Sequence, residues 1–217
     1  MSSAPFIEAP GLAALQVEHG FGTRASAQVA IRELHTLHQV HGSRVVSIPP
    51  PPRAGEEGDA LLALAPGTAV GVWTADCVPI LLVAPQPGAV AAVHAGWRGS
   101  AAQIAGHAVR ALCSSAGCRP EALLAAIGPH IGACCYEVDA PVRDAIRDAE
   151  VFQPGRVGHW SLDLGLLNLR QLVAAGLQAA RIERVGGCTA CEPETYESYR
   201  RDAGRGRMLH WVRARSA

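Results

Sequence analysis

Residues 69–99 decide the fold, and they read AVGVWTADCVPILLVAPQPGAVAAVHAGWRG. This stretch holds three short apolar runs, Ala69 to Thr74, Val78 to Ala84 and Ala89 to His94, separated by two short turns. Apolar runs of four to eight residues that are bounded by turn residues are typical of buried strands. We therefore predict three adjacent strands at the centre of the molecule.

After residue 99, segments with apolar residues at helical spacing alternate with further short apolar runs that suit strands. Ile104, Ala108 and Leu112 recur every four residues, with Ser100 as a candidate N-cap. Further strands are expected at Leu123 to Ile127, Arg181 to Val185 and Met208 to Val212, and a helix at Ala140 to Ala149. A last helix is expected to begin at a cap formed by Ser161 or Asp163 and to end at Gly176, with Leu166, Leu169 and Val173 on one face. Because some strands follow one another directly, the pattern predicts a mixture of α and β elements and not a pure doubly wound sheet.

The bulk properties favour one domain and a small ligand. The chain has 217 residues, which suits a single domain over residues 1–217, and the proline-rich stretch from Pro49 to Gly58 is expected to be an exposed loop between two ordered halves. Lys plus Arg equals Asp plus Glu at 19 each, so no long-range field favours nucleic acid or an anionic membrane. Met1 to Leu15 lacks the features of a signal peptide, and no stretch is apolar enough to span a membrane, so we expect a cytoplasmic protein. Seven cysteines, an odd number, then argue against a disulfide framework.

Three segments carry the residues that bind metals best: QVHG with His41, TADCVP with Cys77, and VHAGWRG with His94. Two imidazoles and one thiolate are donors that zinc prefers. Structural zinc takes four protein ligands, whereas catalytic zinc takes three and leaves one position open. The sequence therefore predicts an open zinc site assembled by the fold, since the spacings are too long for a finger or ribbon.

Other interpretations of these residues stay open. Asp76 could shuttle protons, or it could orient His41 or His94 from behind. Cys77 could instead be a nucleophile paired with His94 in a thiol hydrolase without metal.

A second group of cysteines is given no metal role. Cys188 and Cys191 form a CxxC, which could be half a zinc site or a redox pair. No second CxxC completes four ligands and the context is not thioredoxin-like, so we interpret the pair as a turn that lines the active site. Cys134 and Cys135 are neighbours whose side chains would diverge in an extended chain, so we expect at most one to face any site.

Read together, these segments resemble a known family, the laccase-domain or polyphenol oxidase-like proteins, also called multicopper polyphenol oxidoreductase-like or purine nucleoside phosphorylase family proteins. The resemblance runs over most of the chain, and TADC followed by HAGWRG is its most specific part. The other matching motifs are HGFGTR at His19 to Arg24, QVHG, GDALL at Gly58 to Leu62, IGPHIGACCYEV at Ile127 to Val138, DLGLLNLRQL at Asp163 to Leu172, and GGCTACE through SYRRDAGRGR at Gly186 to Arg207.

The resemblance implies an α+β fold, a layered α/β sandwich with mixed β-sheets, and zinc held by His41, Cys77 and His94. It also implies phosphorolysis of purine nucleosides (adenosine, inosine, guanosine and methylthioadenosine) together with adenosine deamination. On that reading nucleoside and phosphate are the partners, and the catalytic residues are Cys77, Asp76 and Arg98. The substrate-binding residues are Arg98, Tyr136, Arg200 and Arg201, the arginines because guanidinium groups suit phosphate.

The alternatives are an amide hydrolase that edits peptidoglycan precursors, a copper polyphenol oxidase and a binding module without turnover. Copper is the weaker cofactor hypothesis, because a multicopper site needs histidines in repeated short motifs such as HxH and none occurs here. The segment between Arg24 and Gln39 is shorter than in the family, so part of the substrate wall is expected to differ. Oligomeric state is left open.

Overall fold

A six-stranded mixed sheet forms the centre of the computed structural model, which describes residues 4–85 and 88–215. Its order is β13(Ile182–Arg184), β9(Leu124–Ile127), β7(Val78–Val83), β8(Val90–Ala95), β5(Ala60–Ala63), β4(Val45–Ile48). The pairs β13 with β9 and β4 with β5 are parallel, and the others are antiparallel.

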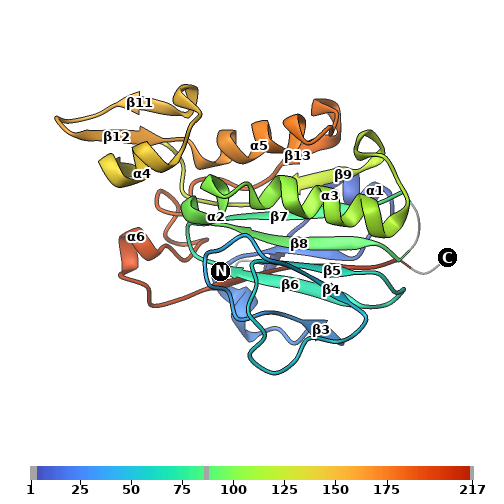
Figure 1. The fold of residues 1–217 in the computed structure, drawn as a ribbon. Coiled ribbons are helices and arrows are strands. Elements are labelled where there is room, and N and C mark those ends of the chain that lie inside the picture. The colour runs from blue at the N-terminus through green and yellow to red at the C-terminus, as the bar shows by residue number, and fades with distance from the viewer. Residues whose placement is uncertain (1–3, 86–87, 216–217) are drawn as a thin grey trace.

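A five-stranded sheet covers one face of the six-stranded sheet (Figure 1). Its order is β1(Phe6–Ile7), β2(His19–Gly22), β14(Met208–Arg213), β6(Ala69–Thr74), β3(Leu34–His35). Only β3 and β6 run parallel. The last strand, β14, thus lies between β2 and β6, so the N-terminal strands reach the central segment through the C-terminal strand.

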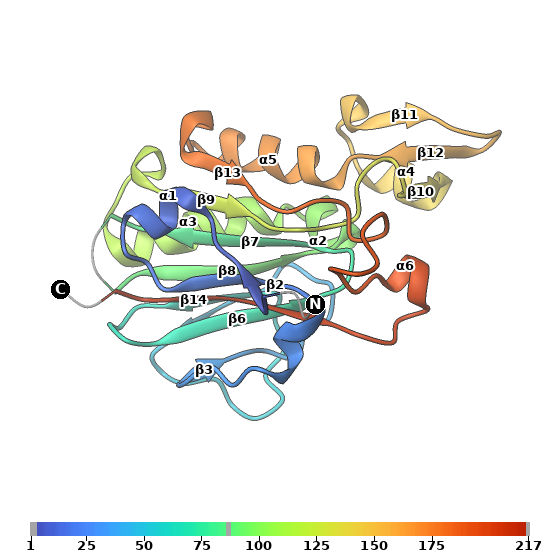
Figure 2. The same cartoon turned by 180° about the vertical axis from the view of Figure 1, so that it is seen from behind.

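Helices cover the other face of the six-stranded sheet, with α3 and α5 lying over it in both views (Figures 1 and 2). The helices are α1(Pro10–Ala14), α2(Trp97–Ala101), α3(Ile104–Ala116), α4(Ala140–Ala145), α5(Leu164–Ala174) and α6(Tyr199–Asp202). Short 3-10 turns are η1(Arg24–Gln28), η2(Pro120–Ala122), η3(Ala149–Val151) and η4(Ala179–Arg181), and a small sheet of order β10(Glu137–Asp139), β12(His159–Leu162), β11(Phe152–Pro154) extends beyond α4 and α5.

Successive side chains of β7 point to opposite faces of the six-stranded sheet and pack into the hydrophobic cores on its two sides. Ile80 and Leu82 pack with the helices, whereas Leu81 and Val83 pack against the five-stranded sheet. All four side chains are almost fully buried. Truncating a fully buried leucine such as Leu81 to alanine costs about 2–5 kcal/mol, because a cavity is left between two closely packed layers. The continuous apolar run in the sequence therefore comes from a strand that is covered on both faces.

The predicted fold class, an α+β layered sandwich with mixed sheets, is confirmed, but some local expectations are wrong. The three apolar runs are not three neighbours in one sheet, because β7 and β8 pair in the six-stranded sheet whereas β6 lies in the five-stranded sheet. Ser100 does not cap α3: it lies buried inside α2, and its Oγ accepts a hydrogen bond from the side chain of Asn168. In α5, which Asp163 caps, the buried face includes Leu164, Leu167 and Leu172, whereas Val173 is exposed. The exposed loop after Pro49 does not separate two halves of the chain, because it connects the paired neighbours β4 and β5.

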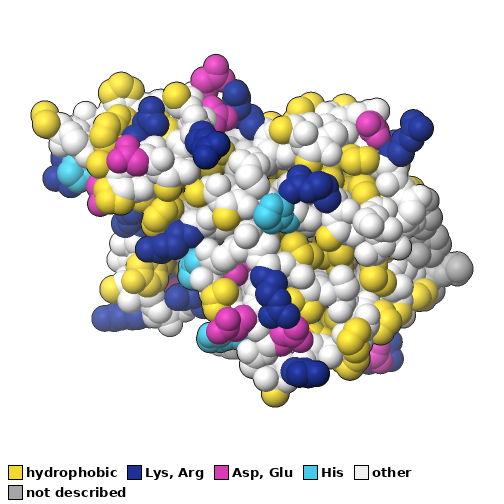
Figure 3. Space-filling model, in the orientation of Figure 1, with side chains coloured by type: hydrophobic (Ala, Val, Ile, Leu, Met, Phe, Trp, Pro, Cys, Tyr) yellow, Lys and Arg dark blue, Asp and Glu magenta, His cyan; other side chains and the backbone are white. Residues whose placement is uncertain are grey.

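The surface matches the charge balance of the sequence. On the face shown in Figure 3, basic and acidic side chains are interspersed and no patch of one sign covers the molecule. Among the residues that the structure describes, no helix has the length and apolarity required to cross a membrane.

Candidate functional site

The strand pairing brings Cys77 and His94 to the same end of the central sheet. Cys77 immediately precedes β7, His94 lies near the end of β8, and the antiparallel register sets Pro79 opposite His94. His94 is buried and Cys77 is half-buried. Two residues that are far apart in the sequence are thus made neighbours by one pair of strands.

His41 joins them from the loop before β4. Its backbone adopts φ 58°, in the left-handed region, where a residue with a Cβ is strained by about 1–2 kcal/mol. The Asp59 carboxylate holds this loop, because Oδ1 accepts the His41 N–H at 2.9 Å and Oδ2 accepts the Gly42 N–H at 2.7 Å. The exposed His41 is therefore fixed through its backbone.

Asp59 also orients His94. It is fully buried, it precedes β5, and its Oδ1 accepts the Nδ1–H of His94 at 2.8 Å. Since Nδ1 is used in this way, Nε2 of His94 is directed toward Cys77 and His41. Sequence reasoning missed Asp59 as a functional residue; the available signal was an acidic residue at the start of a fully apolar strand.

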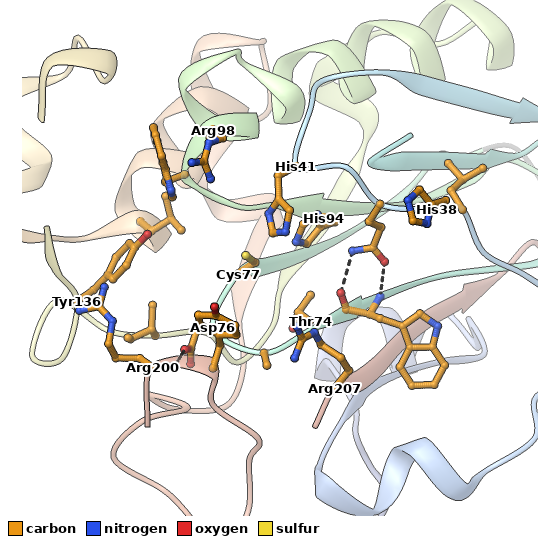
Figure 4. Close-up of a pocket in the computed structure, with 18 residues that line it drawn as sticks. His38, His41, Thr74, Asp76, Cys77, His94, Arg98, Tyr136, Arg200 and Arg207 are labelled. Atoms are coloured by element: carbon orange, nitrogen blue, oxygen red, sulfur yellow. Dashed lines mark hydrogen bonds between the residues drawn. The ribbon is translucent and has the colours of Figure 1, made fainter. Parts of the chain in front are cut away.

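The three side chains fit a metal ion. Their candidate ligand atoms all lie within 4.8 Å of one another, and the rings of His41 and His94 meet edge to face with centroids 4.8 Å apart (Figure 4). A Cβ at Gly96 would lie 3.0 Å from both the Cys77 Sγ and the His41 Nδ1, so the glycine keeps this space open. One thiolate and two imidazoles are a donor set that suits zinc.

The electrostatics of the cluster favour a thiolate. Burial opposes ionisation, yet hydrogen bonds from His41 and His94 lower the pKa of Cys77 to about 6. Burial likewise disfavours the charged form of His94, but its bonds to Asp59 and Cys77 raise its pKa to about 9. Near neutral pH and without a cation, Cys77 and His94 therefore form a thiolate and imidazolium pair.

A pocket of about 610 Å³ opens over the three residues, within the range of small-molecule sites. Arg98 lies over the Trp97 ring at 4.3 Å, and Arg200 lies over the Tyr136 ring at 5.2 Å. The residues that line the pocket are Leu37, His38, Gln39, His41, Trp73, Thr74, Ala75, Asp76, Cys77, His94, Trp97, Arg98, Ile131, Tyr136, Leu164, Tyr199, Arg200 and Arg207 (Figure 4).

Asp76 lines this pocket but does not orient a histidine. Its Oδ1 accepts the hydroxyl of Thr189 at 2.6 Å, and its Oδ2 accepts the backbone N–H of Arg200 at 2.7 Å. Its backbone has φ 82°, and its carbonyl accepts the N–H of Ile131 at 3.0 Å. Asp76 thus ties the Cys77 turn to three neighbouring segments, at Ile131, Thr189 and Arg200. Asp59 makes the contact with His94 that was considered for Asp76.

The predicted arginines divide into two groups. Arg98 and Arg200 line the pocket, together with Tyr136, whereas Arg201 does not. The Arg201 guanidinium donates to the Thr189 carbonyl at 2.7 Å and also binds the adjacent carboxylate of Asp202, so it is engaged elsewhere. Arg207, which lines the pocket, was missed because nothing in its local sequence distinguishes it from the arginines around it.

Known proteins are similar to this chain both in sequence and in fold. The family model of the multi-copper polyphenol oxidoreductase laccases matches residues 16–215. The purine nucleoside phosphorylase YlmD of Geobacillus stearothermophilus is 38% identical over 190 residues, which cover 80% of this chain and 69% of the relative. The adenosine deaminase RL5 of an unknown prokaryotic organism is 39% identical over 164 residues, 73% of this chain and 62% of the relative. The crystal structure of YlmD from Geobacillus stearothermophilus superimposes with a TM-score of 0.87 at 29% identity and covers 100% of this chain and 98% of that chain.

Proposed function

Because the chain belongs to the multi-copper polyphenol oxidoreductase laccase family, we propose that it is a zinc-dependent purine nucleoside phosphorylase with adenosine deaminase as a side activity. Its proposed substrates are adenosine, inosine, guanosine and methylthioadenosine, together with phosphate. One observation supports this most: a single pocket contains the His41, Cys77 and His94 cluster and three arginine side chains.

The proposed metal ligands are His41, Cys77 and His94, with Asp59 behind them. Three protein ligands leave a coordination position open, as in catalytic zinc sites. When bound, zinc supplies a Lewis acid and lowers the pKa of a water to about 7, which suits attack on purine C6 in deamination. Copper would use the same imidazole and thiolate donors, and metal analysis of the purified protein distinguishes the two.

The proposed anion site consists of Arg98, Arg200 and Arg207. None of the three forms an ion pair with a carboxylate of the described residues; the side chains of Arg200 and Arg207 donate to backbone carbonyls. Their positive charge is thus free to face a ligand. Guanidinium groups bind phosphate oxygens through parallel hydrogen bonds, which would hold phosphate as the nucleophile.

Phosphorolysis then requires few steps from the protein. A phosphate oxygen attacks C1′, the C1′–N9 bond breaks, and its electron pair leaves with the purine, which takes up a proton; the products are the free base and ribose 1-phosphate. Burial, together with the charge of Cys77, raises the pKa of Tyr136, so its phenol stays protonated and can donate a hydrogen bond to the substrate. Asp76 is proposed as a positioning residue, because both of its carboxylate oxygens already accept hydrogen bonds.

A second candidate is a thiol hydrolase, including one that edits peptidoglycan precursors. The observation in its favour is the thiolate and imidazolium pair of Cys77 and His94, which needs no metal to form. Chelation separates the two proposals. Removing zinc abolishes the phosphorylase, whereas it exposes the nucleophile of a thiol hydrolase.

The test pairs metal content with turnover of adenosine. Protein purified without added metal is assayed with and without phosphate, and adenine, inosine and hypoxanthine are separated by chromatography. We expect adenine in phosphate and a smaller amount of inosine from deamination, both lost on chelation and restored by zinc. Absence of both products from the zinc-loaded protein contradicts the proposal.

A further inference from the structure

Four of the seven cysteines meet at a second place, outside the pocket. Cys134 and Cys135 lie in the turn that follows β9, and Cys188 and Cys191 lie in the turn that follows β13. β9 and β13 are parallel neighbours, so their following loops leave the sheet side by side. The loops stay in contact, since the Thr189 N–H donates to the His130 carbonyl at 3.0 Å.

This arrangement contradicts both expectations for these residues. Cys134 and Cys135 are in a turn and not in an extended segment, so their side chains converge: their Sγ atoms lie 3.6 and 3.3 Å from the Sγ of Cys191. A second CxxC is not needed, because two adjacent cysteines in a turn supply the missing pair.

The spacing of the four sulfurs matches one tetrahedral ion. All four Sγ atoms lie within 4.8 Å of one another. Zinc–sulfur bonds of about 2.3 Å place tetrahedral sulfur ligands roughly 3.8 Å apart. An iron–sulfur cluster would hold its cysteines farther apart, because an inorganic core stands between them.

We propose that Cys134, Cys135, Cys188 and Cys191 form a second metal site that binds one zinc ion with a closed, structural coordination shell. Four thiolate ligands leave no open position, which separates this site in kind from the three-residue site in the pocket. Binding converts four thiols to thiolates and releases their protons to solvent. The proposal is independent of the function assigned to the pocket.

The backbone at Gly132 lies close to two sulfurs of the cluster. The Gly132 N–H donates to the Cys188 Sγ at 3.2 Å, and a Cβ at Gly132 would lie 3.2 Å from the Cys134 Sγ and 3.5 Å from the Cys188 Sγ. A glycine at position 132 therefore both makes room for two sulfurs and donates to one of them.

The site would hold the wall of the pocket in place. Thr189 lies between two of the cysteines, and its hydroxyl donates to Asp76 next to Cys77. The Thr189 carbonyl also accepts from Arg201 at 2.7 Å. A zinc ion that ties the Cys134 turn to the Cys188 turn thus fixes Thr189, and through it the position of Asp76.

The test counts metal ions in variants of the full chain. Wild-type protein is expected to contain two zinc ions, Cys77→Ser one, the double variant Cys135→Ser/Cys191→Ser one, and the triple variant none. Cys118→Ser, a partly buried cysteine outside both clusters, is the matched control and should retain two. One zinc in the wild type that the double variant retains overturns the proposal.

A measurement on the wild type keeps the test decisive where a variant does not fold. Maleimide labelling followed by peptide mass spectrometry should show Cys134 and Cys191, both exposed in the described structure, protected in the zinc-loaded protein and labelled after chelation. Labelling that is equal in both samples, a mass showing disulfides among the four cysteines, or bound iron and sulfide contradicts a zinc site. Because no nucleoside is used, these outcomes do not depend on the activity of the pocket.

Discussion

Replacing Asp59 with asparagine removes one negative charge from behind the histidines while the shape of the side chain is kept. Asp59 is fully buried and accepts three short hydrogen bonds, from the Nδ1–H of His94 at 2.8 Å, the N–H of His41 at 2.9 Å and the N–H of Gly42 at 2.7 Å. An asparagine amide offers one oxygen, and its NH2 group would face donors. Asp59→Asn therefore leaves at least one of these N–H groups without an acceptor.

The loss can be sized in two ways. A hydrogen bond to a charged group contributes about 1.5–3 kcal/mol. Removing a partner that orients a ligating histidine typically lowers metal affinity about 10–100-fold, which is about 1.4–2.7 kcal/mol. The two ranges agree. Protons compete with zinc for His94, whose pKa Asp59 helps to raise to about 9. Losing Asp59 weakens this competition at neutral pH and so offsets part of the loss in zinc affinity. The full loss is therefore expected above pH 9, where His94 is neutral in both proteins.

The assay is chelator competition for zinc, in a Cys135→Ser/Cys191→Ser background so that one site is measured. Asp148→Asn is the matched control: Asp148 accepts the Glu150 N–H at 3.1 Å, pairs with Arg170 at 2.6 Å and lies outside the pocket, so its change should leave zinc affinity unaltered. Zinc affinity of Asp59→Asn within twofold of the parent, above pH 9, would refute the reasoning.

Three further predictions concern the same pocket. Gly96→Ala places a Cβ 3.0 Å from the Cys77 Sγ and the His41 Nδ1, so zinc affinity should fall at least about tenfold by chelator competition, with unchanged circular dichroism; unchanged affinity counts against the ligand set. In metal-free protein the lowered pKa makes Cys77 a thiolate above about pH 6, so labelling of Cys77 by iodoacetamide should rise with a midpoint near pH 6. His94→Ala should move this midpoint to higher pH, and a midpoint that does not move contradicts the pairing of Cys77 with His94. Arg98→Gln should raise the KM for phosphate about tenfold or more with zinc content unchanged, which steady-state kinetics at varied phosphate would measure, and an unchanged KM removes Arg98 from the anion site.

The apolar patterning of the sequence was sufficient to predict the central strands. The three runs within residues 69–99 form β6, β7 and β8, because strands covered on both faces consist of continuous apolar residues. The pattern did not predict that β6 lies in the other sheet, since pairing partners leave no signal in the apolar run itself. The pattern did not predict which face of α5 is buried, since Asn168 and Gln171 are on that face and bond to Ser100 of a neighbouring helix. Polar residues that are satisfied by tertiary contacts leave no periodic signal.

The candidate site divides in the same way. His41, Cys77 and His94 could be proposed together because their side chains have distinctive chemistry, and the structure places them together. Asp59 acts through contacts with residues that are distant in sequence, and so spacing alone gave it no role. The four-cysteine cluster was missed for another reason. Neighbouring side chains point apart in an extended chain, but Cys134 and Cys135 lie in a turn, where both sulfurs reach the same place.

The most direct test of the central claim is the release of hypoxanthine from inosine by zinc-loaded protein, compared with Cys77→Ala at varied phosphate. The account predicts hypoxanthine and ribose 1-phosphate in equal amounts, in proportion to phosphate until saturation, and neither product from Cys77→Ala. Zinc-loaded protein that releases no base, releases it without phosphate, or retains activity in Cys77→Ala would contradict the account.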